Sequence, residues 1–156
     1  IGLRLKEFDW VEKFIHDFST LLDIRYRENA ITFNLAQLYF YKKDYQRVIE
    51  QLSKVEYEDF TYNLNSKTLL MASYYELDEF DALNSLLDTF RLYVQRNKKL
   101  TKGKGSHYQN TIALVRKLMK IKLGDTKQIE KLTSEVESTQ GVVSKNWILE
   151  KLAALK

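Results

Sequence analysis

Apolar positions recur at helical spacing through most of this chain. Four segments share one plan, in which an acidic residue is followed by apolar residues three or four positions apart. The segments are KEFDWVEKFIHDF (6–18), KDYQRVIEQLSKV (43–55), DEFDALNSLLDTF (78–90) and GDTKQIEKLTSEV (124–136). The acids are Glu7, Asp44, Glu79 and Asp125. Because a carboxylate at a helix N-terminus accepts hydrogen bonds from unpaired amides and opposes the helix dipole, the pattern predicts a helix start at each acid.

Another helical stretch precedes three of these starts, so the plan predicts helical hairpins. The aromatic residues that follow the acids, Phe8, Tyr45 and Phe80, lie 37 and then 35 residues apart, which sets the repeat at about 35 residues. The predicted helices are 7–22, 27–42, 44–56, 62–77, 79–97, 106–123, 125–138 and 143–155.

Two successive hairpins resemble a known repeat family. The residues that match the family are Leu35, Ala36, Tyr39 and Tyr45 in the first hairpin and Leu70, Tyr74 and Phe80 in the second. The unit resembles the tetratricopeptide (TPR) repeat, a helix–turn–helix of 34 residues. RENAITFNLAQLYFY and LLDTFRLYVQR also look like an uncharacterised bacterial group of TPR-like proteins. The repeat is degenerate, because bulky residues stand where it prefers small ones: Val48, Val55, Leu83 and Phe90.

The resemblance implies an all-α fold, an α-α solenoid of about eight helices in one domain over residues 1–156. Its units are 1–22, 27–56, 62–97 and 106–138, and a capping helix follows at 143–155. Residues 1–5 read as the end of a helix that starts upstream, so we expect the C-terminal part of a longer chain with a truncated N-terminus. Trp147 is expected to anchor the cap, since a solenoid must close its apolar end.

Composition narrows the classes of function. The 156 residues contain no cysteine, which excludes disulfides, thiolate metal sites and cysteine nucleophiles. The absence of cysteine is compatible with the cytosol, and we slightly favour a cytoplasmic location. No apolar run is long enough for a transmembrane segment. His16 and His107 read as surface or capping residues, and the acid clusters 56–59 and 76–79 border helix ends. No nucleophile motif, metal-ligand spacing or glycine-rich cofactor turn is present, so we expect no catalysis, no cofactor and no metal.

Positive charge is concentrated in one stretch. Residues 89–124 contain ten lysines and arginines and no acid, whereas the rest of the chain has 15 basic and 21 acidic residues. The candidate basic patch comprises Arg96, Lys98, Lys99, Lys102, Lys104, Arg116, Lys117 and Lys120. Segment 91–122 would bind a polyanion such as nucleic acid, an acidic protein or a membrane surface. The alternative is a solvated face balanced by the acidic remainder of the fold.

The TPR resemblance also implies a binding groove, formed by the first helices of successive units. Its candidate residues are Phe33, Gln37, Phe40, Tyr41, Thr68, Ala72 and Tyr75. Such an aromatic groove suits a partner protein or peptide, either extended or helical. The alternative is that Phe33 and Phe40 pack against neighbouring helices. We therefore expect a non-catalytic protein-interaction scaffold, with polyanion binding or a spacer or self-association module as alternatives.

Overall fold

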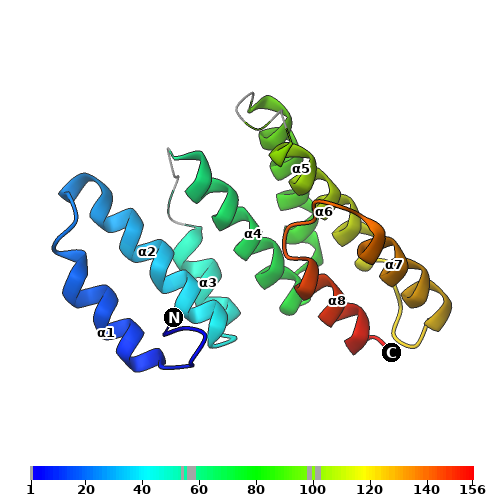
Figure 1. The fold of residues 1–156 in the computed structure, drawn as a ribbon, viewed down its shortest axis with the longest axis horizontal. Coiled ribbons are helices and arrows are strands. Elements are labelled where there is room, and N and C mark those ends of the chain that lie inside the picture. Colours follow the sequence, from blue (N-terminus) through cyan, green and yellow to red (C-terminus); the bar gives the residue numbers. More distant parts are fainter. Residues whose placement is uncertain (1, 54, 56–58, 98–99, 101–102) are drawn as a thin grey trace. The chain divides into compact units, whose positions relative to one another are not determined.

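A computed structural model shows a chain built from helices and turns (Figure 1). It describes residues 2–53, 55, 59–97, 100 and 103–156. The described residues form eight helices and no strand, which confirms the predicted all-α class. The helices are α1 (Phe8–Ser19), α2 (Ile24–Tyr41), α3 (Tyr45–Leu52), α4 (Phe60–Glu76), α5 (Phe80–Arg96), α6 (Lys104–Leu118), α7 (Thr126–Ser138) and α8 (Lys145–Ala154).

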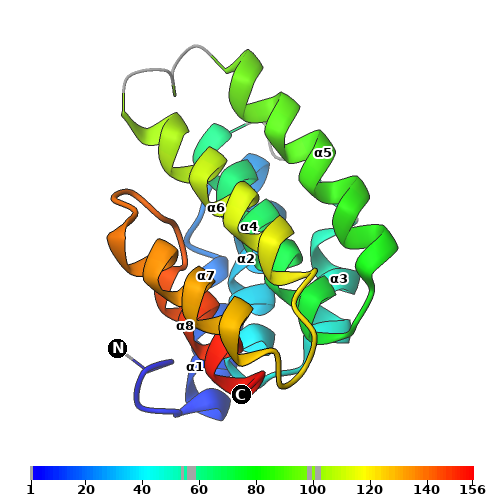
Figure 2. The ribbon, with the colours of Figure 1, turned by 90° about the vertical axis from the view of Figure 1, so that its right-hand side faces the viewer.

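The chain divides into two compact units, Ile1–Glu79 and Phe80–Lys156, each with four helices among its described residues. Within the first unit, α1 packs on α2, and both α2 and α3 pack on α4. Helices α2 and α3 also pack on each other. The second unit repeats this pattern with α5 to α8, and Figure 2 shows α7 and α8 side by side. Each unit is therefore a hairpin with one helix before it and one after it.

The turn between α2 and α3 explains why the acid-then-aromatic step recurs. Lys43 adopts a left-handed backbone conformation with φ 61°, and its N–H donates to the Phe40 carbonyl. The N–H of Asp44 donates to the Tyr39 carbonyl at 2.9 Å, which completes a Schellman motif that ends the helix. The same pair of backbone bonds and a positive φ recur at Asp78–Glu79 and at Lys6–Glu7.

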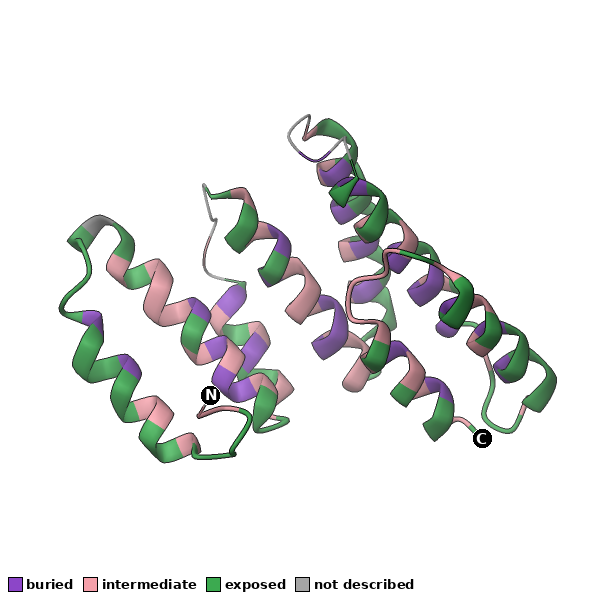
Figure 3. Ribbon diagram, in the orientation of Figure 1, coloured by how far each residue is buried: buried purple, intermediate pink, exposed green. Residues whose placement is uncertain are grey.

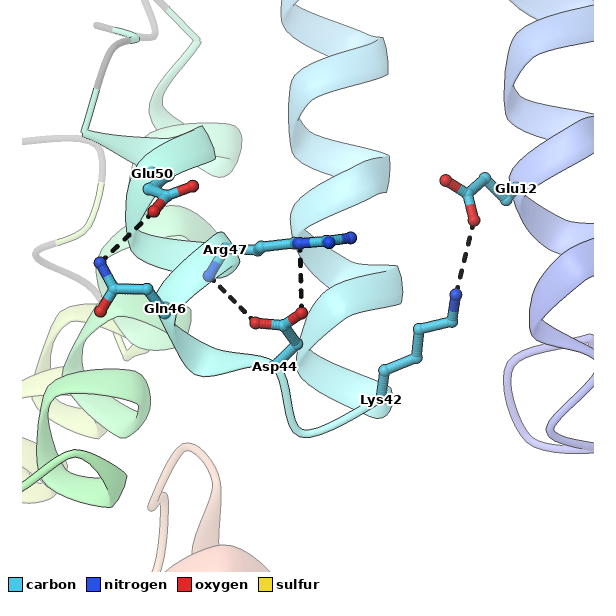
Figure 4. A network of polar contacts seen from close by, with 6 residues as sticks. All are labelled: Glu12, Lys42, Asp44, Gln46, Arg47 and Glu50. Atoms are coloured by element: carbon cyan, nitrogen blue, oxygen red, sulfur yellow. Dashed lines mark hydrogen bonds and ion pairs between the residues drawn. The ribbon is translucent and has the colours of Figure 1, made fainter.

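The acids themselves behave differently from one another. The carboxylates of Asp44 and Asp125 accept from the backbone N–H of Arg47 and Gln128, so these two cap their helices as predicted. Figure 4 shows Asp44 facing Arg47 at the start of α3. Glu7, in contrast, makes no side-chain capping bond to α1.

We expect Lys43→Gly to stabilise the protein by about 0.5–1 kcal/mol, because glycine removes the Cβ strain of a left-handed residue. Urea denaturation followed by circular dichroism measures the change. Lys43→Ala is the matched control, because it keeps the Cβ and removes the same charge. An equal gain from alanine would contradict the explanation by backbone strain.

The fourth turn departs from the other three. Helix α6 ends at Leu118 rather than at the predicted residue 123, and the chain continues through a longer connection to Gly124. Gly124 has φ 78°, and its N–H donates to the Leu155 carbonyl just after α8 at 2.8 Å. A bond from a distant segment thus replaces the local Schellman bond at this turn.

Partly buried hydrogen bonds join the α7–α8 connection to α6. Thr111, which is 2% exposed, accepts from the Val143 N–H at 2.8 Å, and its hydroxyl lies 2.8 Å from the His107 carbonyl. The side-chain amide of Asn110 donates to the Gly141 carbonyl at 3.2 Å. Val143, which was predicted to begin the last helix, therefore lies in a loop that α6 holds in place.

The core of the first unit is a cluster of buried side chains on α2 and α3. Its members are Phe33, Ala36, Tyr39, Val48 and Leu52, with Leu69 and Leu70 of α4 packed against it. In the second unit, buried residues recur at helical spacing on α5, α6, α7 and α8 (Figure 3). The ring of Phe90 lies 5.7 Å from the ring of Tyr108, and burial raises the pKa of the Tyr108 phenol.

Candidate functional site: an exposed aromatic ladder

Helix α1 carries more apolar surface than its neighbour covers. Ile15 is buried towards α2, as its helical spacing predicts. Trp10, Phe14 and Phe18 form a second stripe, each four residues after the last, and they are 59%, 43% and 51% exposed. Their rings stack in series, with centroids 5.2 Å apart for Trp10 and Phe14 and 4.5 Å apart for Phe14 and Phe18. We call these three residues the aromatic ladder.

The aromatic ladder borders a series of hollows along α1. A cavity of about 200 Å³ lies between α1 and α2, with Ile31 and Asn34 on its α2 side. A second cavity, of about 370 Å³, shares Phe14, Ile15 and Asn34 with the first and extends to Trp10 and Gln37. A third hollow, of about 470 Å³, adjoins Gly2, Leu5, Glu7 and Trp10. Shared lining residues make the three hollows one groove along the helix, which we call the α1 groove.

The polar surroundings of the α1 groove are sparse. Asn34 and Gln37 supply side-chain amides on the α2 side. Beyond the groove, Lys42 reaches from the end of α2 to Glu12 of α1 with 3.4 Å between Nζ and Oε2 (Figure 4). This pair is partly exposed, so it contributes at most about 1 kcal/mol. The α1 groove is consequently an apolar surface, and its few polar lining residues are Glu7, Ser19, Asn34 and Gln37.

The groove predicted from the TPR resemblance is only partly open. Phe33 and Ala72 are 5% and 4% exposed. The ring of Phe33 meets the ring of Tyr62 edge-on, with 5.1 Å between the ring centroids. Phe40 packs against the core cluster of α2 and α3, and its ring centroid lies 5.6 Å from that of Tyr45. The alternative reading, in which Phe33 and Phe40 pack against neighbouring helices, is therefore the one that the structure supports.

The remaining predicted groove residues keep some exposure. Tyr41 is half-exposed, whereas Tyr75 is partly buried. The hydroxyl of Thr68 donates to the Leu64 carbonyl of its own helix at 2.9 Å. Gln37 lines the α1 groove, so it joins the predicted groove to the observed one.

The residues of the basic patch have different surroundings. Arg116 forms an ion pair with Asp88 of α5 at 2.7 Å, and Lys117 pairs with Glu135 of α7. Lys120 joins Lys117 at a cleft of about 350 Å³ between α6 and α7, to which Lys131 also contributes. Arg96 and Lys104 are exposed near the adjoining ends of α5 and α6. Lys98, Lys99 and Lys102 lie outside the described residues.

The other candidate residues have structural surroundings. Asp59 caps α4 by accepting from the backbone N–H of Thr61 at 2.8 Å and of Tyr62 at 3.1 Å. His16 is exposed on α1, and the His107 ring lies so close to Gly141 that a Cβ there would be 2.2 Å from the imidazole. Within the described residues, no three His, Asp or Glu side chains gather in a way that could hold a metal ion. Over the same part of the chain, each helix lacks the length or the apolar character needed to cross a membrane.

The aromatic ladder was not predicted. Phe18 continues the helical spacing of Phe8, Val11 and Ile15, which predicts that it faces the core, and this pattern gives no role to Trp10 or Phe14. Their spacing marks a second apolar stripe on the helix, but it does not say whether a neighbouring element covers that stripe. A scan against models of known protein families found no match, and searches of curated proteins and of solved structures found no similar protein.

Proposed function

We propose that this chain is a non-catalytic protein-interaction module made of TPR-like helical hairpins, and that its partner docks on the aromatic ladder. The interlocked packing of α2, α3 and α4, which recurs in α6, α7 and α8, supports the repeat. The main support for a binding role is that Trp10, Phe14 and Phe18 stack on one another and are exposed. Large exposed aromatic surfaces beside a groove are typical of protein-binding sites.

Polyanion binding through residues 91–122 is the second candidate. The exposed Arg96, Lys104 and Lys120 favour it, whereas the ion pairs of Arg116 and Lys117 weaken it. Its binding would fall steeply with salt, because phosphate contacts release counterions. Docking on an apolar ladder would depend far less on salt.

Site-specific photo-crosslinking tests the proposed function in the cell that makes the protein. Phe14 is replaced by p-benzoylphenylalanine, and the control carries the same group at Leu123, which is 78% exposed in the other unit. We expect position 14 to form an adduct with a defined protein at about tenfold the yield of position 123, because only the group at position 14 would lie inside the interface. Trp10→Ala should abolish that adduct.

Two results would overturn the proposal. One is a yield at position 14 no higher than at position 123. The other is an adduct that nuclease treatment removes, which would favour polyanion binding instead. Circular dichroism of each variant verifies that it is folded, and the exposure of the substituted side chains makes this the expected outcome.

A further inference from the structure

A cleft in the second unit gathers three lysine side chains from two segments of the chain. It has a volume of about 350 Å³ and lies between α6 and α7, which pack together (Figure 2). We call it the lysine cleft. Its lining residues are Lys117, Lys120, Ile121, Gln128, Lys131, Leu132 and Glu135.

The lysine cleft carries an excess of positive charge. Its lining contains three lysines and one carboxylate, that of Glu135, which pairs with Lys117. Among the residues that the structure describes, neither Lys120 nor Lys131 forms an ion pair. Two ammonium groups from opposite sides of the cleft are therefore left without a compensating charge.

The neighbouring acids do not cancel this excess. Residues 117–135 contain five lysines and three acids. The carboxylate of Asp125 caps α7 and accepts from both the backbone N–H and the side-chain amide of Gln128. Glu130 is exposed on α7 and is not part of the cleft lining. The positive charge of the cleft is thus available to a ligand.

The lysine cleft also offers apolar surface. Leu132 is 4% exposed, and Ile121 is partly buried beside it. The carbonyls of Lys117 and Leu118 at the end of α6 accept from the backbone N–H groups of Lys120 and Ile121, each at 3.1 Å, so these acceptors are engaged. Sites for small molecules commonly have volumes of about 300–1,000 Å³, so this cleft has room for an organic body as well as an anionic group.

Charge favours a phosphate ester over a carboxylate. A phosphate monoester carries a charge of about −1.5 to −2 at neutral pH, which matches the two uncompensated ammonium groups, whereas a carboxylate carries a single charge. Lysine binds phosphate as a point charge with three N–H donors. Ammonium groups on opposite sides of the cleft can contact different oxygens of one phosphate.

We propose that the lysine cleft binds a phosphate monoester of a small apolar molecule. Its phosphate lies between Lys120 and Lys131, and its apolar part covers Ile121 and Leu132. The proposed protein-interaction function does not require this site, because the cleft belongs to the second unit and shares no residue with the aromatic ladder.

A nucleic acid bound along segment 91–122 would use a different set of lysines. Lys104 begins α6 and Lys117 lies near its end, so they are about 20 Å apart along the helix. A polymer that spans this helix would engage Lys104, whereas Lys131 lies on α7 outside that segment. The two lysines therefore distinguish a small ligand in the cleft from a polymer on the basic patch.

Titration of backbone amide NMR shifts at constant ionic strength tests the ligand class. The probes are phenyl phosphate, benzoate and inorganic phosphate. We expect phenyl phosphate to saturate with a Kd of about 1 mM or less and to shift the amides of residues 120–121 and 131–132. Benzoate should bind at least about fivefold more weakly because it carries less charge. Inorganic phosphate should bind about threefold more weakly because it lacks an apolar part.

Substitution of single lysines tests the site. Lys131→Gln should weaken phenyl phosphate binding by roughly three- to fivefold, and Lys120→Gln/Lys131→Gln by at least about tenfold. Lys104→Gln is the matched control, because it removes the same charge at the other end of α6 and should leave the affinity unchanged. All three side chains are exposed, so the variants should fold, which circular dichroism verifies.

Several results would overturn the proposed ligand. They are a titration with phenyl phosphate that does not saturate by about 20 mM, and an affinity for benzoate or inorganic phosphate equal to that for phenyl phosphate. Equal weakening by Lys104→Gln and Lys131→Gln would also contradict the site. If both variants weaken a single-stranded oligonucleotide equally while phenyl phosphate does not bind, the lysines belong to a nucleic-acid surface instead. Phe14→Ala should not change the affinity for phenyl phosphate, so photo-crosslinking at position 14 remains a separate test of the proposed function.

Discussion

Phe33→Ala should lower the free energy of unfolding by about 3–5 kcal/mol, because it removes a ring from a closed core. Phe33 is 5% exposed and packs with Val48 and Leu52 of α3, and its edge-on contact with Tyr62 would be lost as well. Urea denaturation followed by circular dichroism measures the loss. An effect this large would be a considerable fraction of the total stability of a domain of this size.

Tyr41→Ala is the matched control for Phe33→Ala. Tyr41 lies on the same helix and belongs to the same predicted groove, but it is half-exposed, so its loss should change stability by no more than about 0.5 kcal/mol. If Phe33 were a groove residue, the two variants would have similarly small effects on stability. That result would contradict the assignment of Phe33 to the core.

Phe90→Ala should destabilise the second unit by a similar amount, about 3–5 kcal/mol. Phe90 is 1% exposed, and its ring contacts Tyr108 of α6. The change is informative because a regular TPR repeat prefers a small residue at this position, whereas a small residue here would leave a cavity. The fluorescence of Trp147 on α8 reports unfolding within the same unit, best in a variant in which Trp10 is phenylalanine.

Leu92→Ala provides the comparison on α5. Leu92 is 41% exposed on the same helix, so its truncation should cost no more than about 0.5 kcal/mol. A loss of stability from Leu92→Ala as large as that from Phe90→Ala would indicate that burial does not set the cost.

Phe18 and Phe90 show how far sequence reasoning reaches. Each closes the apolar stripe of its helix, ten residues after the aromatic that follows the acid. The periodicity predicts both helices correctly, but Phe18 is 51% exposed and Phe90 is 1% exposed. Helical spacing identifies an apolar face, whereas its burial depends on which other elements cover it. That information comes from tertiary packing, so the aromatic ladder could not be recognised from periodicity alone.

Some helix boundaries could also be predicted from the sequence and others could not. The helix starts at Asp44 and Asp125 depend on local chemistry, so a carboxylate followed by an apolar stripe predicted them. The end of α6 was not predictable, because neither glycine nor proline occurs between Leu118 and Gly124. There the Gly124–Leu155 backbone bond joins segments about thirty residues apart, and single-sequence patterns do not contain such pairings.

Packing between close neighbours along the chain has a kinetic consequence. Within each unit, the helix pairs that pack extensively are at most two helices apart, so contact order is low. The chain also contains no proline, so refolding lacks the slow phase that prolyl isomerisation imposes. Each unit should therefore regain its helices and its core rapidly after dilution from denaturant.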